Sequence, residues 1–163
     1  MKKQQKIIII CLAAVIIAAS VIVFIAGRKD DPPKLTVSNE LGIEISARLG
    51  TYTWKTGLTS DESSDSVGPL FHYKAHVLPR IEPSENDNYR LILEFDKKPD
   101  SVAVAVYPES AADAQDYGRM MSRETAAYRS GYKFTVPSDG IYIVHVYASW
   151  SKGECYYEFY TTP

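Results

Sequence analysis

Residues 141–160 read IYIVHVYASWSKGECYYEFY, and this stretch decides the fold class that the sequence predicts. Its first half, residues 141–150, is rich in β-branched and aromatic side chains, which favour strands. The turn-forming residues 151–153 (SKG) follow, and residues 155–160 (CYYEFY) return as a second strand. We therefore predict a β-hairpin and expect a chain built mainly from strands.

The second strand of this hairpin has two different faces. Successive side chains of a strand point to opposite sides of the sheet, so Cys155, Tyr157 and Phe159 share one face, which we expect to be buried. Cys155 is then a small buried hydrophobe, with a reactive or intermolecular thiol as the alternative. Tyr156 and Tyr160 point to the opposite side.

Upstream of the hairpin, the chain repeats short strand-like segments separated by turns. Residues 43–49 (IEISARL) and 89–95 (YRLILEF) alternate apolar and polar side chains, as half-buried strands do. Residues 59–68 (TSDESSDSVG) are expected to form a loop, and residues 109–129 a short helix or a long inserted loop. Further strands are expected at residues 35–37, 51–54, 70–78, 102–107 and 132–136.

About seven or eight short strands with regular turns are typical of a β-sandwich. We therefore expect an all-β, immunoglobulin-like β-sandwich over residues 35–163. Only two cysteines occur, and Cys11 lies in an apolar run near the N-terminus while Cys155 lies in the predicted hairpin. Because a membrane would separate these two thiols, the sandwich is expected to lack the inter-sheet disulfide of antibody domains.

The apolar run at residues 7–27 (IIIICLAAVIIAASVIVFIAG) contains no charged side chain. A helix of about 20 apolar residues spans the hydrocarbon layer of a bilayer, which is about 30 Å thick. A signal peptide has a shorter apolar core of about 7–15 residues, followed by a small-residue cleavage site. We therefore expect a retained transmembrane helix, with cleavage near residues 18–20 (AAS) as the alternative.

The charges beside this run set its expected orientation. Lys2, Lys3 and Lys6 precede it, and every acidic residue of the chain follows it. Because positively charged flanks stay in the cytoplasm, we expect a single-pass protein of the cell membrane whose C-terminal domain is extracellular. The expected organisation is a cytoplasmic N-terminus (1–6), a transmembrane helix (7–27), a proline-containing linker (28–34) and an extracytoplasmic domain (35–163).

Composition and motifs argue against several functions. The net charge is −2, and without a clustered basic face we expect no nucleic-acid partner. The S-x-x-K match at residues 149–152 lies at a predicted strand end, whereas serine β-lactamases need it in a different context. On the predicted strand, His72 and His76 would lie about 13 Å apart, too far to share a zinc ion. The acidic residues 61–65 lack a calcium-loop motif. We therefore expect no catalytic residue, no cofactor, no metal site and no enzymatic activity.

Several short segments resemble those of one group of bacterial proteins. They are GTYTW (50–54), FDKKP (95–99), FTVP (134–137), GIY (140–142) and the hairpin around Trp150. Through them the chain is similar, over residues 35–161, to uncharacterised extracytoplasmic domains on short membrane-anchored chains of Gram-positive (Firmicutes-type) bacteria. Similar domains are also appended to antibiotic-sensor-like metallopeptidase homologues. The resemblance implies a β-sandwich outside the cytoplasm, and because its motifs are structural it assigns no functional site.

The aromatic content of the chain indicates a role in binding. Twelve tyrosines and two tryptophans occur, and exposed tyrosines suit glycan or protein contacts, since they combine apolar area with a polar tip. Ordinary cross-strand aromatic pairing is the alternative. We expect a non-enzymatic, membrane-tethered binding module of the bacterial envelope that contacts an envelope protein or a cell-wall polymer. A small-ligand or envelope-stress sensor that signals through a membrane partner is the second hypothesis. The predicted interaction surface consists of Tyr142, Tyr156 and Tyr160.

Overall fold

The computed structural model describes residues 17, 30–56, 59–63, 67–82, 88–127 and 131–163. The chain divides into two compact units, and the larger one, residues 32–54 with 61–163, contains the core of the β-domain. The predicted membrane span at residues 7–27 lies, apart from Ile17, outside the described residues and stays a prediction. Within the described ranges, no helix has the length and apolar character needed to cross a bilayer.

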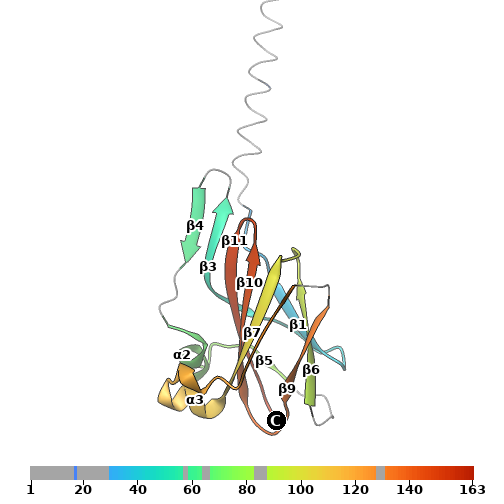
Figure 1. Ribbon diagram of the computed structural model, residues 1–163, viewed down its shortest axis with the longest axis vertical. Coiled ribbons are helices and arrows are strands. Elements are labelled where there is room, and N and C mark those ends of the chain that lie inside the picture. Colours follow the sequence, from blue (N-terminus) through green and yellow to red (C-terminus); the bar gives the residue numbers. More distant parts are fainter. Residues whose placement is uncertain (1–16, 18–29, 57–58, 64–66, 83–87, 128–130) are drawn as a thin grey trace, which may run out of the picture. The chain divides into compact units, whose positions relative to one another are not determined.

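Two sheets, almost entirely antiparallel, make up most of the domain (Figure 1). The four-stranded sheet has the order β2 (Glu44–Ser46), β1 (Leu35–Asn39), β6 (Asn88–Phe95) and β9 (Tyr132–Pro137). The seven-stranded sheet has the order β4 (Thr59–Ser63), β3 (Arg48–Thr56), β11 (Gly153–Thr161), β10 (Tyr142–Trp150), β7 (Ser101–Pro108) and β8 (Ser122–Ala127). The short strand β5 (Arg80–Ile81) adds to β11 in parallel. The predicted all-β sandwich is therefore confirmed.

The two sheets bury an apolar core between their facing sides. The four-stranded sheet contributes Leu35, Val37 and Leu93, which are at most 1% exposed. The seven-stranded sheet contributes alternate residues of its strands, such as Val144 and Val146. Burial of one such side chain stabilises the fold by about 1.5–3 kcal/mol, so the alternation along each strand decides which face turns inward.

The hairpin predicted at residues 141–160 forms the centre of the seven-stranded sheet as β10 and β11. Its predicted inward face is confirmed, because Cys155, Tyr157 and Phe159 are buried in the core. Burial raises the pKa of the Cys155 thiol to about 11. The thiol therefore stays protonated at neutral pH, and Cys155 is the small buried hydrophobe that the sequence predicts.

Two segments differ from the sequence prediction. Residues 70–78, expected as an edge strand, contain the helix α2 (Pro69–Lys74). Pro69 occupies the first helical turn, where a missing N–H costs no hydrogen bond, and Leu70 is fully buried. Residues 59–68, expected as a loop, include strand β4, which lies beside β3 in the sheet.

The irregular segment at residues 109–129 contains the expected short helix and also an additional strand. The helix α3 (Glu109–Ala114) ends at Gln115, which adopts a left-handed conformation with φ of 51°. A 3-10 turn, η1 (Tyr117–Arg119), follows, and the chain then forms β8 at the edge of the seven-stranded sheet. The segment therefore widens the sheet as well as covering it.

Three of the segments that carry the resemblance meet at one end of the core. Trp150 packs edge-to-face on Trp54 and Phe95, with ring centroids 5.5 Å and 5.6 Å away. Its indole N–H donates to the carbonyl oxygen of Lys97 at 3.0 Å, and the Lys97 ammonium lies 5.5 Å from the centroid of the Trp54 ring. These segments therefore build a packing cluster.

The start of the domain is fastened to distant strands. The Tyr157 hydroxyl donates a hydrogen bond of 2.7 Å to the carbonyl oxygen of Pro33. The Lys34 N–H donates to the Asp96 carboxylate at 2.9 Å, and the Asp96 N–H donates to the Lys34 carbonyl oxygen at 3.2 Å. The expected linker at residues 28–34 therefore ends in residues that belong to the folded domain.

Tyr157→Phe is expected to lower the free energy of unfolding by about 1–2 kcal/mol, because the buried Pro33 carbonyl loses its donor. Urea denaturation followed by circular dichroism measures the change. Tyr52→Phe is the matched control, since Tyr52 packs against the same core and its hydroxyl has no hydrogen bond to a described residue. It should cost less than about 0.5 kcal/mol. Equal losses in the two variants would contradict the role of the hydrogen bond to Pro33.

Candidate functional site

The side of the seven-stranded sheet that faces away from the core carries polar and aromatic residues, and we call it the outer face. On β10 and β11 its side chains lie in cross-strand pairs, close enough for contact. The pairs are Tyr147 with Tyr156, His145 with Glu158, and Ile143 with Tyr160. Titratable and aromatic side chains are therefore neighbours along this face.

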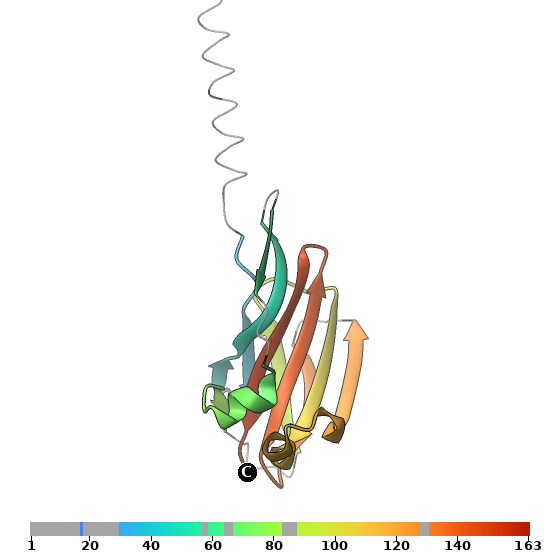
Figure 2. The ribbon, with the colours of Figure 1, turned by 90° about the vertical axis from the view of Figure 1, so that its left-hand side faces the viewer.

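The helices α2 and α3 cover one end of the outer face (Figure 2). The ring of Tyr160 packs edge-to-face on Tyr73 of α2, with centroids 5.1 Å apart. A second apolar cluster between the helices and the sheet consists of Leu70, Leu78, Tyr107, Ala111, Ala112 and Ile143. This end of the outer face is therefore closed.

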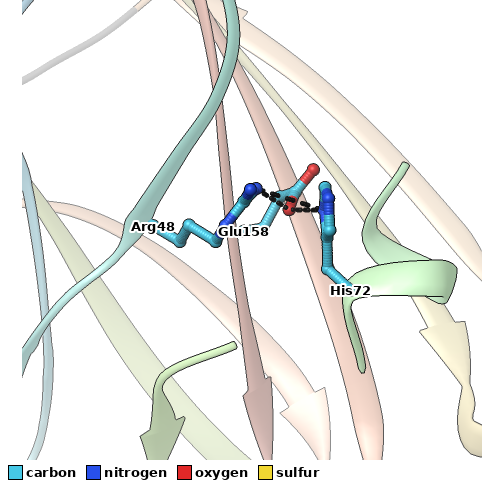
Figure 3. A network of polar contacts seen from close by, with 3 residues as sticks. All are labelled: Arg48, His72 and Glu158. Atoms are coloured by element: carbon cyan, nitrogen blue, oxygen red, sulfur yellow. Dashed lines mark hydrogen bonds and ion pairs between the residues drawn. The ribbon is translucent and has the colours of Figure 1, made fainter. Parts of the chain in front are cut away.

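Beneath α2, three polar side chains from different elements meet (Figure 3). Oε2 of Glu158, on β11, lies 2.6 Å from Nδ1 of His72, on α2, and 3.0 Å from Nη1 of Arg48, on β3. A carboxylate only accepts hydrogen bonds, so Arg48 and His72 both donate to it. Glu158 is 2% exposed and His72 4%. We call this group the Arg48–Glu158–His72 network.

Burial and hydrogen bonding act on Glu158 in opposite directions. Burial raises the pKa of the Glu158 carboxyl, whereas His72 and Arg48 act to lower it. A buried carboxylate costs several kcal/mol unless it is paired, so the two donors allow Glu158 to lie under the helix. Gly50 provides the space, because a Cβ at this position would lie 3.0 Å from Oε1 of Glu158. The network thereby joins α2 to β3 and β11.

Next to the network, the outer face is hollowed by a pocket of about 200 Å³ over β7, β10 and β11. The pocket and the network are neighbours, because His145 lies directly opposite Glu158 in the sheet. Side chains in its lining include Ala105 of β7, His145 of β10, Tyr156 of β11 and Met120, which follows η1. A ligand can reach this part of the outer face.

Three rings stand side by side along the pocket. The ring centroid of Tyr156 lies 5.0 Å from those of His145 and Tyr147, and the His145 ring is stacked on it at 30°. Burial, with a smaller contribution from the nearby His72, lowers the pKa of His145 to about 4. The imidazole is therefore neutral at pH 7. Among the described residues, none forms a hydrogen bond with the His145 ring.

The structure separates the three tyrosines of the predicted interaction surface. Tyr156 lies on the outer face in the pocket, and Tyr160 lies on the same face beneath α2. Tyr142 is 7% exposed and points into the core between the sheets. It pairs with Thr161, whereas its neighbour Ile143 is the residue opposite Tyr160. The predicted surface is corrected accordingly, because adjacent residues of a strand face opposite sides.

The two histidines spaced four residues apart also differ from the expectation of a strand. His72 lies in α2 and contacts Glu158, whereas His76 follows the helix and is exposed. In the part of the chain that the structure describes, no group of three His, Cys, Asp or Glu side chains could hold a metal ion. The absence of a metal site stays a prediction for the chain as a whole.

The Arg48–Glu158–His72 network is not found by sequence reasoning, since its members lie 24, 86 and 110 positions apart. One signal is present in the sequence. Glu158 stands between Tyr156 and Tyr160 on one face of a strand whose other face is buried, and a carboxylate in such surroundings needs a cation. Its partners depend on α2, which the sequence analysis assigns to a strand.

No protein-family model matches the chain, and no curated protein is found to be similar to it. The resemblance to extracytoplasmic domains of Gram-positive bacteria therefore stays a prediction. The function has to be inferred from the geometry of the outer face, from the network and the pocket beside it.

Glu158→Ala is expected to lower the free energy of unfolding by about 3 kcal/mol, because it removes the acceptor that His72 and Arg48 share in a buried setting. Glu82→Ala is the matched control. Glu82 also pairs with an arginine, Arg80, at 2.7 Å, but the two side chains are 57% and 53% exposed, so the loss should be about 0–1 kcal/mol. Urea denaturation of both variants measures the difference. Similar losses would show that the network adds no more than a surface ion pair.

Neutral His145 is expected to make the fold sensitive to acid. Its pKa is lowered from 6.5 to about 4 in the folded chain, so the unfolded chain binds the proton more readily. The stability that this group contributes is present above pH 6.5 and is lost as the pH falls toward 4.

His145→Phe keeps a ring but removes this titration. The loss of unfolding free energy between pH 6.5 and pH 4 should shrink by on the order of 1–3 kcal/mol. His76→Asn, at an exposed position, should leave the acid dependence unchanged. Urea denaturation at several pH values provides the measurement, and an unchanged slope in His145→Phe would contradict the burial of a neutral imidazole.

Proposed function

We propose that the chain is a non-enzymatic binding module of a bacterial cell envelope, tethered to the cell membrane by residues 7–27 and held outside the cytoplasm. Its binding surface is the open part of the outer face around His145, Tyr147 and Tyr156. The main observation behind the proposal is that the helices cover only part of the outer face. The helices α2 and α3 close one end, while a row of aromatic rings lines a pocket at the other.

Rings fixed on a sheet suit recognition. Tyrosine offers a large contact area and a polar tip, and it has few rotatable bonds to immobilise on binding. β10 is paired along its length with β11 on one side and β7 on the other, so the positions of its side chains are set by the sheet. A surface formed in advance loses less conformational entropy on binding, which supports a contact with an envelope protein or a cell-wall polymer.

The placement of the acid–base pair supports a non-enzymatic role. A general acid or base must come within hydrogen-bond distance of the proton that it transfers. Glu158 and His72 are almost fully buried and bonded to each other, so they hold α2 on the sheet instead of facing a substrate. The side chains described in the pocket lining include no serine, cysteine or lysine beside His145.

We further propose that the sandwich is immunoglobulin-like. In immunoglobulin domains, strands C, F and G form one sheet and strands A, B, E and D the other. The observed strand order supports the assignment, because β11, β10 and β7 are consecutive neighbours, as G, F and C are, and β1, β6 and β9 are neighbours in the other sheet.

The location outside the cytoplasm is supported by the uncharged run at residues 7–27 and by the lysines that precede it. The alternative role, a small-ligand or stress sensor, would pass its signal through this same run. Apart from Ile17, residues 7–27 lie outside the described part of the chain, so the sensor role has no separate structural support.

Crosslinking on intact cells tests whether the chain binds an envelope partner through this surface. A membrane-impermeant crosslinker is expected to link the wild-type chain to an envelope partner, as measured by mass spectrometry. The double variant Tyr147→Ser/Tyr156→Ser should give at least about 10-fold less linked product, because two aromatic contacts of an interface are lost. Phe71→Ser is the control, since Phe71 is 46% exposed and lies on α2 away from the pocket lining.

The control variant should keep the wild-type yield. Absence of any product from outside the cell would contradict the extracellular location. Equal yields from the wild type and the double variant would contradict the choice of surface, provided that both chains keep the same melting temperature.

A further inference from the structure

We infer that the pocket beside Tyr156 binds a single phenol ring, an uncharged aromatic ring whose one hydroxyl group hydrogen-bonds to His145. This inference rests on the proposed binding role of the outer face and gives the chemical class of the ligand. The phenol group comes either from a free small molecule or from a tyrosine side chain of a partner polypeptide.

The size of the pocket fits one ring. Its volume is about 200 Å³, and a cavity of about 150 Å³ is enough to hold benzene. The hollow exists because β7 places two small residues, Ala103 and Ala105, directly opposite Tyr147 and His145 of β10. Small side chains beside large ones leave room above the alanines, so a flat guest can lie over them.

The walls of the pocket favour an aromatic guest. The rings of His145, Tyr147 and Tyr156 line one side, and Tyr107 adds a fourth ring. Aromatic rings attract each other in offset and edge-to-face arrangements beyond the effect of burial alone. Met120, also in the lining, has a flexible thioether that packs well against rings. A guest ring would thus find several aromatic partners.

The described side chains of the lining offer few partners to a charged ligand or a sugar. No side chain in the described lining carries a charge at pH 7, so a charged ligand would lose water without gaining an ionic partner. Within the described part of the lining there is also no carboxylate, amide or guanidinium group. A sugar ring carries several hydroxyl groups, and each one left without a partner weakens binding. A phenol carries only one.

His145 is the partner for that one hydroxyl. A neutral imidazole has one nitrogen that donates and one that accepts a hydrogen bond, and no described residue bonds to either. The ring is held in place by stacking on Tyr156. Its cross-strand neighbour Glu158 is already bonded to His72 and Arg48. The imidazole is therefore oriented at the pocket with its hydrogen-bonding groups available.

Binding is tested by NMR on the full chain in lipid nanodiscs, with empty nanodiscs as the reference. The probes are N-acetyl-tyrosinamide, N-acetyl-phenylalaninamide, which lacks only the hydroxyl, and 4-hydroxybenzyl alcohol, a free phenol. Methyl α-glucoside serves as the sugar probe. We expect a phenol to shift the amide signals of β7, β10 and β11 with a Kd on the order of 1 mM. The phenylalanine analogue should bind about 10-fold more weakly.

Variants of the chain locate the site. Ala105→Leu fills the hollow and should abolish binding of the phenol. If Ala105→Leu does not fold, Tyr156→Ser replaces it, because this variant removes a wall of the pocket and should also abolish binding. His145→Phe should still bind the ring but lose the 10-fold preference for the hydroxyl. His76→Asn, at an exposed histidine outside the pocket lining, should keep that preference. A merely structural role of His145 would not alter the ratio of the two affinities.

The two phenols distinguish the source of the ligand. Tighter binding of N-acetyl-tyrosinamide supports a tyrosine of a partner polypeptide, and tighter binding of 4-hydroxybenzyl alcohol supports a free phenol. The inference is overturned if neither phenol shifts the signals at a concentration 10-fold above the expected Kd, or if the glucoside binds instead. It is also overturned if His145→Phe still binds the tyrosine analogue more tightly than the phenylalanine analogue. Loss of crosslinking in Tyr147→Ser/Tyr156→Ser without any phenol binding would overturn the ligand class alone. Phenol binding without crosslinking would overturn only the proposed partner contact.

Discussion

The central hairpin of the seven-stranded sheet buries its apolar inner face fully, and α2 and α3 bury one end of its more polar outer face. Its outer face carries Glu158, and a helix laid over this residue encloses a carboxylate in an apolar setting. Donors from Arg48 and His72, and the missing side chain at Gly50, make that enclosure possible. The position of α2, and with it the part of the outer face that stays open, depends on this one buried group.

The sizes of the side chains on the outer face decide which part of it packs against a helix and which part is left open for a ligand. At the closed end, Ala111 and Ala112 let α3 approach the sheet and share its apolar cluster. At the open end, the alanines of β7 stand opposite the rings of β10, neither α2 nor α3 lies over them, and the result is a pocket. A similar pattern of small and large residues thus packs a helix in one place and leaves space for a ligand in the other.

The hairpin is predictable from sequence because its signal is local, and alternation within residues 141–160 fixes the strands and the inward face of β11. The pairing register between β10 and β11 cannot be read from the alternation within either strand. The turn places even-numbered residues of β10 opposite odd-numbered residues of β11, so Tyr142 faces the core with Thr161. The helix α2 is harder still to foresee, because so short a helix depends on tertiary contacts, such as that of His72 with Glu158, 86 positions away.

The fastening of the first residues gives the domain a mechanical property. Tension on the chain at Pro32 does not act on β1 alone, because Pro33 is bonded to Tyr157 in the last strand and Lys34 to Asp96 after β6. The pull is shared between both sheets before β1 can peel away. Forced unfolding is governed by the rate of crossing the unfolding barrier and not by equilibrium stability. The N-terminal end of the domain should therefore resist stretching until both links rupture, and then yield in a single step.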